Sequence, residues 1–147
     1  MAQTNAFNVV EATIEDIHTG YKSGKLTCHQ LVQMYLDRIE AFDKKGPNIN
    51  ALITINAEAL KEADRLDAAY KASGPIGPLH GIPVIMKDQA DVKGMPTTLG
   101  SLLFKDYFPD YDGGENVDVV VTYLINKCQS YMDNAAASST RSRPGTA

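Results

Sequence analysis

The stretch Gly77-Pro-Leu-His-Gly-Ile-Pro-Val-Ile-Met-Lys87-Asp88 joins a glycine- and proline-rich segment to a short apolar run and two charged residues. The density of glycine and proline in its first half predicts a loop of fixed shape rather than a helix. Residues 84–86 are apolar and follow Pro83, which a strand tolerates at its first position because proline has no N–H to donate. The stretch therefore predicts a short strand over residues 84–86 that ends at Lys87.

Lys87 stands where this strand meets a polar, glycine-containing turn, and open α/β sheets bind ligands at such places. Burial there would disfavour the ammonium form, and a neutral lysine accepts a proton from a hydroxyl nucleophile. The alternative is a lysine that reaches solvent or pairs with Asp88 or Asp91. Position alone leaves both interpretations open.

Two helices are predicted at the start of the chain, each with a capping box. Thr13 with Asp16 begins the first helix, which Gly24 ends, and Thr27 with Gln30 begins the second. The second helix carries the longest apolar stripe, made of Leu31, Val32, Tyr35, Leu36, Ile39 and Phe42.

A strand and a third helix are predicted between these helices and the loop. Residues 51–55 form a short β-branched run bounded by asparagines, which is typical of a strand. Asn56 is expected to cap a helix that ends at Gly74. Because helices and strands alternate, the fold class is α/β, with the strands sharing one sheet under the helices. The predicted buried face of the third helix is Ala59, Ala63, Leu66 and Tyr70.

The character of the chain changes after Tyr111. A single helical turn is expected over residues 100–104, before this change. Apolar residues after the Gly113-Gly114 break recur at helical spacing, which favours a helix, although residues 119–122 would also suit a strand. The last residues are too polar and small to form a core, so they are expected to be a disordered tail. The expected divisions are an N-terminal extension (1–12), a main partial domain (13–111), a divergent segment (112–133) and the tail (134–147).

The composition excludes several classes of protein. The 147 residues carry 18 acidic and 14 basic side chains, a net charge of −4, which argues against a nucleic-acid partner. The length suits one domain and excludes two full enzymatic domains. Cys28 and Cys128 lie too far apart in sequence to suggest a disulfide framework, which is typical of a reducing compartment. With no apolar run long enough to cross a bilayer and no secretory leader pattern, a cytoplasmic protein without a membrane span is expected.

Other groups with possible chemistry have simpler interpretations. His18, His29 and His80 share no metal-ligand spacing, so no metal site is predicted. Cys28 and His29 are helical neighbours that point about 100° apart, so they are expected to be a core residue and a surface residue. Asp64 and Asp67 are expected to lie on a solvated helix face.

The motif around Lys87 resembles the N-terminal half of the amidase signature family of serine hydrolases. The similarity joins the stretch from Gly77 to Asp88 with Gly94-Met-Pro-Thr-Thr98-Leu-Gly-Ser101. The run that begins at Ser23 resembles the early helices of that family, and residues 48–54 resemble its first strand. The resemblance extends over residues 13–111, or to residue 126 if the valine-rich segment is the next helix of the family.

The resemblance implies hydrolysis of a carboxamide C–N bond by a Ser–Ser–Lys triad on an α/β fold with a large mixed sheet. This chain would hold the N-terminal helices and the first strands of that sheet. Lys87 matches the family's lysine, and its implied role is to accept a proton, through a bridging serine in a cis peptide, from the nucleophilic serine. No metal or organic cofactor is implied, and the substrate would be a small-molecule amide.

The two serines of the triad lie several tens of residues beyond the lysine in the family, within a stretch rich in glycine and serine. The later pair Ser138-Ser139 lacks the glycines that would turn the chain tightly. We therefore expect a truncated amidase-family chain that keeps only the lysine and is inactive alone.

Two other functions remain open. The first is a non-catalytic interaction or oligomerisation module, in which the helix over residues 28–42 docks on a partner. In such a module, unpaired strand edges would also allow copies of the chain to associate. Lys87 would also suit Schiff-base formation with a carbonyl compound.

Overall fold

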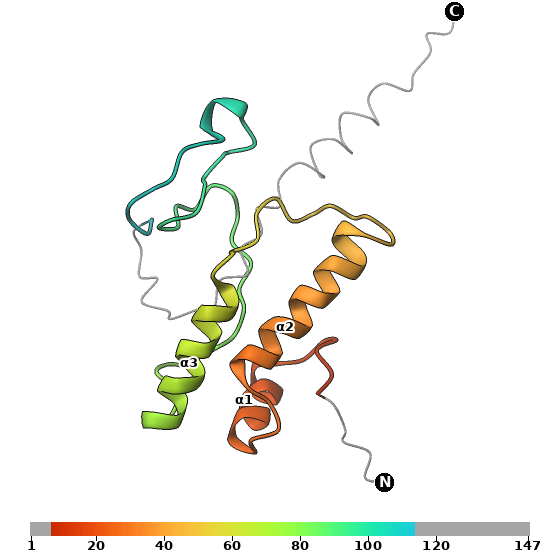
Figure 1. Ribbon diagram of the computed structural model, residues 1–147, viewed down its shortest axis with the longest axis vertical. Helices are drawn as coiled ribbons and strands as arrows, with labels where there is room; N and C mark the ends of the chain where they lie inside the picture. Colours follow the sequence, from red (N-terminus) through yellow and green to blue (C-terminus); the bar gives the residue numbers. More distant parts are fainter. Residues whose placement is uncertain (1–6, 114–147) are drawn as a thin grey trace, which may run out of the picture.

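A computed structural model describes residues 7–113 of the chain. It contains the α-helices α1 (Ile14–Lys22), α2 (Cys28–Arg38) and α3 (Ala59–Ser73). A π-helical turn, η1 (Ile39–Lys44), continues α2, and a 3-10 turn, η2 (Leu102–Phe104), lies close to the helical turn expected there. In Figure 1, α2 and α3 lie side by side, and the green-to-teal segment forms a looped lobe beyond the N-terminal end of α3. The predicted tail, Ser138-Ser139 and all but two residues of the divergent segment lie outside the described residues.

Both predicted capping boxes are present. The Thr13 hydroxyl oxygen accepts the Asp16 N–H at 3.1 Å, and the Asp16 carboxylate accepts the Thr13 N–H at 2.9 Å. Thr27 and Gln30 make the same reciprocal pair at 3.1 and 3.0 Å. These four residues lie within single turns, so the local sequence sets where α1 and α2 begin. Gly24, with a φ of +67°, follows the last turn of α1 as predicted.

The apolar stripe of the second helix ends earlier than predicted. From Ile39 the chain winds as a π-helix, and the Lys45 N–H donates to the Glu40 carbonyl five residues back at 3.0 Å. The wider turn takes Phe42 out of the stripe, and its exposed ring lies 5.1 Å from the Arg38 guanidinium carbon.

A buried carboxylate holds the segment that follows. Asp43 accepts the Ala51 N–H at 2.6 Å and the Leu52 N–H at 3.3 Å, and it pairs with the Lys44 ammonium at 3.0 Å. Burial opposes ionisation, but the hydrogen bonds from Lys44 and the two amides outweigh it and lower the pKa of Asp43. The first amides of the predicted strand over residues 51–55 are therefore bound by a side chain.

α3 begins three residues after the predicted cap. The Asn56 side-chain oxygen accepts the Glu58 N–H at 2.9 Å, and its carbonyl accepts the Ala59 N–H at 3.2 Å, which forms a turn ahead of the helix. The predicted inner face is confirmed, with Ala59, Ala63 and Leu66 buried and Tyr70 half-buried.

The core lies where the three helices meet. α2 and α3 pack directly on one another, and the loop before Lys87 adds Ile82. Ten residues form this cluster: Ile17, Tyr21, Leu26, Cys28, Leu31, Val32, Ala59, Ala63, Leu66 and Ile82.

The two predicted strands are not formed within residues 7–113. Residues 51–55 have no regular structure, and of residues 84–86 only Val84 makes an isolated bridge. A strand exists only when a neighbour completes its hydrogen-bond ladder, and the described residues supply no such ladder to either segment. The sheet predicted from the sequence is therefore not confirmed here. No helix within residues 7–113 combines the length and apolar character needed to cross a membrane.

Candidate functional site

Lys87 follows the irregular segment that begins at Pro83, and its side chain is exposed. Its carbonyl accepts the Ala90 N–H at 2.9 Å, which starts the predicted turn. Among residues 7–113 Lys87 reaches solvent, which is the first half of the alternative interpretation, and its ammonium makes no ion pair there. The described residues present Lys87 as an accessible amine and do not enclose it.

Asp88, next in sequence, is fully buried and holds the following loop. Its carboxylate accepts the Thr98 N–H at 2.7 Å, the Thr98 hydroxyl and the Gly100 N–H at 3.3 Å. One side chain thus ties the backbone beside Lys87 to a point ten residues later. Sequence reasoning did not assign this role, although both partners lie within the motif that resembles amidases.

Further contacts close the loop after Asp88 into a small lobe. The Gly94 N–H donates to the Pro109 carbonyl at 3.1 Å, the Thr97 N–H to the Tyr107 carbonyl at 3.0 Å, and the Gly113 N–H to the Asp91 carbonyl at 2.8 Å. Val92 and Met95 are buried inside it and pack against Met86. The lobe has its own apolar contacts, which fix the loop beside Lys87.

An apolar cavity of about 450 Å³ lies beside the segment that leads to Lys87. The cavity is lined by residues from the end of α2, from η1 and from the two segments predicted as strands. No acid or base other than a tyrosine lines it, so it offers apolar contact rather than proton transfer. The lining residues are Tyr35, Ile39, Leu52, Ile55, Pro83, Val84 and Ile85.

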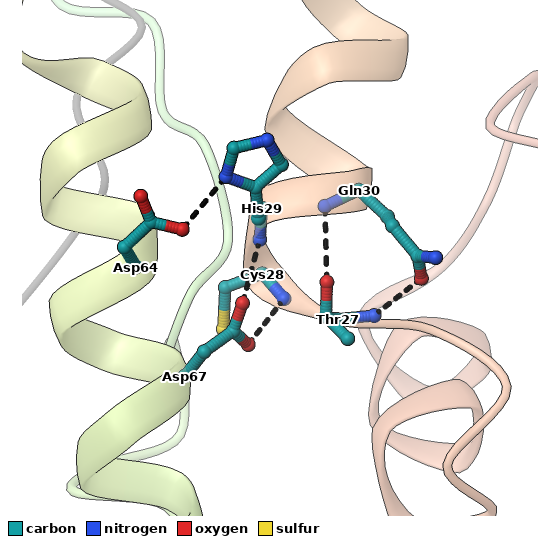
Figure 2. A network of polar contacts seen from close by, with 6 residues as sticks. All are labelled: Thr27, Cys28, His29, Gln30, Asp64 and Asp67. Carbon is teal, nitrogen blue, oxygen red and sulfur yellow. Dashed lines mark hydrogen bonds and ion pairs between the residues drawn. The ribbon is translucent and has the colours of Figure 1, made fainter.

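The carboxylates Asp64 and Asp67 do not form the plain solvated face that was predicted. Figure 2 shows both reaching from α3 to the first turn of α2. Asp67 accepts the N–H groups of Cys28 at 2.7 Å and His29 at 3.1 Å, and Asp64 pairs with His29 Nδ1 at 2.7 Å. Asp67 therefore satisfies two free amides at the helix start, where negative charge is favourable. The prediction failed because the partners lie on another helix.

Cys28 is a core residue, as predicted, and not a nucleophile. It is 1% exposed, and burial, with the nearby Asp67 charge second, raises its thiol pKa to about 12. A thiol with such a pKa remains protonated near neutral pH. Within residues 7–113 no three histidine, cysteine or acidic side chains gather as a metal would require.

Comparison with known proteins identifies the family. The amidase family model matches residues 30–145. The resemblance was expected to end at residue 111 or 126, so the match to the family extends further along the chain than predicted. A glutamyl-tRNA(Gln) amidotransferase subunit from Streptomyces avermitilis is 31% identical over 95% of this chain and 28% of its own length. The corresponding subunit from Alkaliphilus metalliredigens is 42% identical over 71% of this chain and 21% of its own.

Solved structures agree. The peptide amidase of Stenotrophomonas maltophilia matches 81% of this chain with a TM-score of 0.69 and 32% identity. An amidase family protein of Bacillus anthracis matches 71% with a TM-score of 0.66 and 35% identity. These are α/β enzymes, and this chain spans about a quarter of their length, 24% and 21%. The chain belongs to the amidase signature family and corresponds to part of its domain.

Proposed function

We propose that Lys87 is the lysine of a Ser–Ser–Lys amide-hydrolysing site. The observation that carries this proposal is the loop motif itself: Lys87, which makes no ion pair among residues 7–113, is followed by a buried Asp88 that fastens residues 98–100 beside it, and the rest of the domain would have to bury the amine. An amine that acts as a proton acceptor must be free of carboxylate partners, since an ion pair holds the ammonium form.

The proposed chemistry divides amide cleavage into two steps. The serine oxygen bonds to the amide carbon while its proton passes to the bridging serine, whose own proton passes to Lys87. The C–N bond then breaks, and the nitrogen leaves with a proton returned along the same path. Water cleaves the resulting ester, which releases the carboxylic acid and restores the serine. Backbone N–H groups would stabilise the oxyanion.

We further propose that residues 1–147 supply the lysine without the serines and do not hydrolyse amides alone. No serine within residues 7–113 donates a hydrogen bond to Lys87, and the Ser138-Ser139 pair lacks neighbouring glycines. The class of substrate is an amide, in keeping with the names of the peptide amidase and amidotransferase relatives.

Ammonia release tests the absence of turnover. The purified chain, Lys87→Ala and the matched control Lys93→Ala, an exposed lysine in the same loop, are each incubated with simple aliphatic and aromatic primary amides. We expect no ammonia above the buffer blank from any of the three. Turnover that Lys87→Ala abolishes and Lys93→Ala retains would contradict the proposal that the serines are missing.

A chimera tests the lysine itself. Residues 13–111 replace the matching segment of the Stenotrophomonas maltophilia peptide amidase, which supplies the rest of the domain. If Lys87 is the proton acceptor, Lys87→Ala lowers kcat of an active chimera by about 10²- to 10⁴-fold, while Lys93→Ala leaves it within a factor of about two. Equal activity of the two variants would assign Lys87 no catalytic role.

A second candidate function is an interaction or oligomerisation module. The observation in its favour is the apolar cavity and its rim, where the Ile85 side chain is 65% exposed. The docking surface expected on the helix over residues 28–42 is reduced, because Leu31 and Val32 are buried in the core. We propose that the face around Ile85 mediates self-association.

Light scattering after size exclusion tests this interaction. We expect a mass above that of one chain, which Ile85→Lys lowers and Ile76→Lys does not, since Ile76 is similarly exposed but does not line the cavity. A monomer at every concentration that also retains no partner in a pull-down would remove this candidate.

We also propose a cytoplasmic location. Support comes from Cys28, a free buried thiol that needs no oxidising compartment. Fractionation of the native host with an antibody against the chain would show it beside cytosolic markers, and recovery from a secreted fraction would contradict the proposal.

A further inference from the structure

The outer end of the lobe carries the most exposed large apolar side chains of residues 7–113. Leu102 and Leu103 in η2 are 85% and 91% exposed, the highest values among such residues there. Figure 1 shows η2 at the top of the lobe, away from the three helices. An exposed apolar patch of this kind on a soluble chain marks an interaction site. Five exposed residues of this run form what we call the apolar tip: Leu102, Leu103, Phe104, Tyr107 and Phe108.

The apolar tip is held in one shape before any partner binds. The Ser101 hydroxyl oxygen accepts the Leu103 N–H at 3.2 Å, and the Ser101 carbonyl accepts the Phe104 N–H at 3.1 Å. The Tyr107 N–H donates to the Phe104 carbonyl at 3.0 Å, and the buried Asp88 carboxylate fixes the turn that precedes η2. Because these bonds already order the backbone, burying the tip against a partner costs little further conformational entropy.

The apolar cavity beside the segment that leads to Lys87 matches the apolar tip in size and chemistry. Its volume of about 450 Å³ is about three times that of the ~150 Å³ cavity that accommodates benzene, so it has room for two leucine side chains. Of its lining residues only Leu52 is buried, so the cavity opens to solvent. No residue of the tip lines it. The described part of the chain therefore carries a protruding apolar group and an apolar recess at separate places.

The charges around the two surfaces are of opposite sign. The lobe over residues 89–113 carries four aspartates against two lysines. The segments that line the cavity, residues 35–55 and 83–87, carry four basic side chains against three acidic ones. Arg38 and Lys87 in these segments are exposed and make no ion pair among the described residues. The carboxylates of the lobe therefore favour its approach to this cationic rim, and they oppose the meeting of two tips from different copies.

We propose that the apolar tip of one copy of the chain inserts into the apolar cavity of a second copy. This inference rests on the self-association proposed for the face around Ile85 and names the surface that occupies that face. Leu103 would enter deepest, with Leu102 beside it and the aromatic residues of the tip over the rim. Each copy offers one tip and one cavity, so the contact is head to tail and continues into longer assemblies. A face-to-face contact through Ile85 alone would instead close as a dimer.

Two complementary variants of the full chain test the contact. Leu103→Lys places a charge on the tip and leaves the cavity intact, whereas Ile85→Lys alters the cavity and leaves the tip intact. Sedimentation equilibrium between about 10 and 500 μM suits a Kd of about 100 μM, the weak end expected for so small an interface. We expect the mass of the wild-type chain to rise with concentration beyond that of a dimer, and each variant alone to remain a monomer.

An equimolar mixture of the two variants gives the deciding measurement. The intact tip of the Ile85→Lys copy should enter the intact cavity of the Leu103→Lys copy, so the mixture should form a dimer and nothing larger. Ile76→Lys is the matched control, because Ile76 is similarly exposed but belongs to neither surface, and this variant should associate as the wild-type chain does.

Charge reversal tests the cationic rim. Arg38→Glu should raise the Kd about two- to five-fold, because it sets a carboxylate against the acidic lobe. Lys25→Glu makes the same change of charge at an exposed lysine that precedes α2 and belongs to neither surface, so it should leave the Kd unchanged. Equal effects of the two reversals would overturn the proposal, since the lobe would then not lie beside Arg38.

The outcomes of the mixing experiment separate this inference from the proposal on which it rests. A mixture that stays monomeric while circular dichroism shows both variants folded overturns the inference, and so does growth of the mixture beyond a dimer. Association that Ile85→Lys abolishes and Leu103→Lys retains overturns the inference alone, because the face around Ile85 would then bind something other than the tip. A monomeric wild-type chain over the whole range overturns both. Should Leu103→Lys fail to fold, Leu102→Lys takes its place in the same mixture.

Discussion

Gly81 lies directly against the thiol of Cys28. A Cβ atom at Gly81 would stand 2.2 Å from Cys28 Sγ, far inside any van der Waals contact. The backbone of Gly81 also has a φ of +70°, a conformation that side chains strongly disfavour. This contact fixes the loop that leads to Lys87 on the first turn of α2.

Gly81→Ala should destabilise the chain by about 2–4 kcal/mol, because it adds backbone strain to an overpacked contact. Urea unfolding followed by circular dichroism measures the change. Gly77→Ala is the control, because a Cβ there meets nothing within 4 Å and its φ is not positive. Adding Cys28→Ala to Gly81→Ala should recover part of the loss, and strict additivity of the two changes would contradict the contact.

Asp67→Ala should cost about 1–3 kcal/mol of stability, since it leaves the Cys28 and His29 amides without an acceptor. Asp64→Ala should cost no more than about 1 kcal/mol, because its ion pair with His29 is largely exposed. The same unfolding measurement compares the two. Equal losses would mean that Asp67 acts only as a surface charge.

Asp88→Ala should release the loop after Lys87. Hydrogen exchange should accelerate at the Thr98 amide, whose acceptor is removed, more than at the Gly100 amide, which also donates to the Thr98 hydroxyl, and stay unchanged at the amides within α2. Asp106→Ala is the control, because that carboxylate is exposed and pairs only with Lys105 in this part of the chain. Unaltered exchange at Thr98 in the Asp88 variant would show that the other contacts of the loop are enough to hold it in place.

Stability should fall as the pH drops below about 6.5, in part through His80. Burial lowers the pKa of His80 below its ordinary value of 6.5, with Arg65 and His18 adding to this effect and the Leu66 carbonyl and Asp67 opposing it. The unfolded chain then binds more protons, so the contribution is fully present above the unfolded pKa and is lost toward the folded one. Urea unfolding between about pH 7.5 and pH 5.5 should show a smaller slope in His80→Phe than in wild type. Identical slopes in the variant and in wild type would exclude His80 as a source of the pH dependence of stability.

Much of the helical framework was predictable because its determinants are local. Thr13 with Asp16 and Thr27 with Gln30 are capping pairs three residues apart, and they formed as expected. The core face of α3 followed from residue spacing alone. The end of the α2 stripe did not follow from spacing, because the chain winds as a π-helix from Ile39 and Asp43 within that turn binds the amides of Ala51 and Leu52, which lie outside the helix.

The sequence by itself determined the three helices, the capping boxes of α1 and α2 and the family motif around Lys87, since each depends on residues close together in the chain. Only the tertiary structure decided that Asp67 caps another helix, that Asp88 fastens residues 98–100, and that His18 and His80 share a cavity. These contacts join residues from ten to more than sixty positions apart, and no local pattern encodes such a distance. The two strands predicted over residues 51–55 and 84–86 also could not be decided from the sequence alone, because a strand forms only when a neighbouring strand completes its hydrogen bonds.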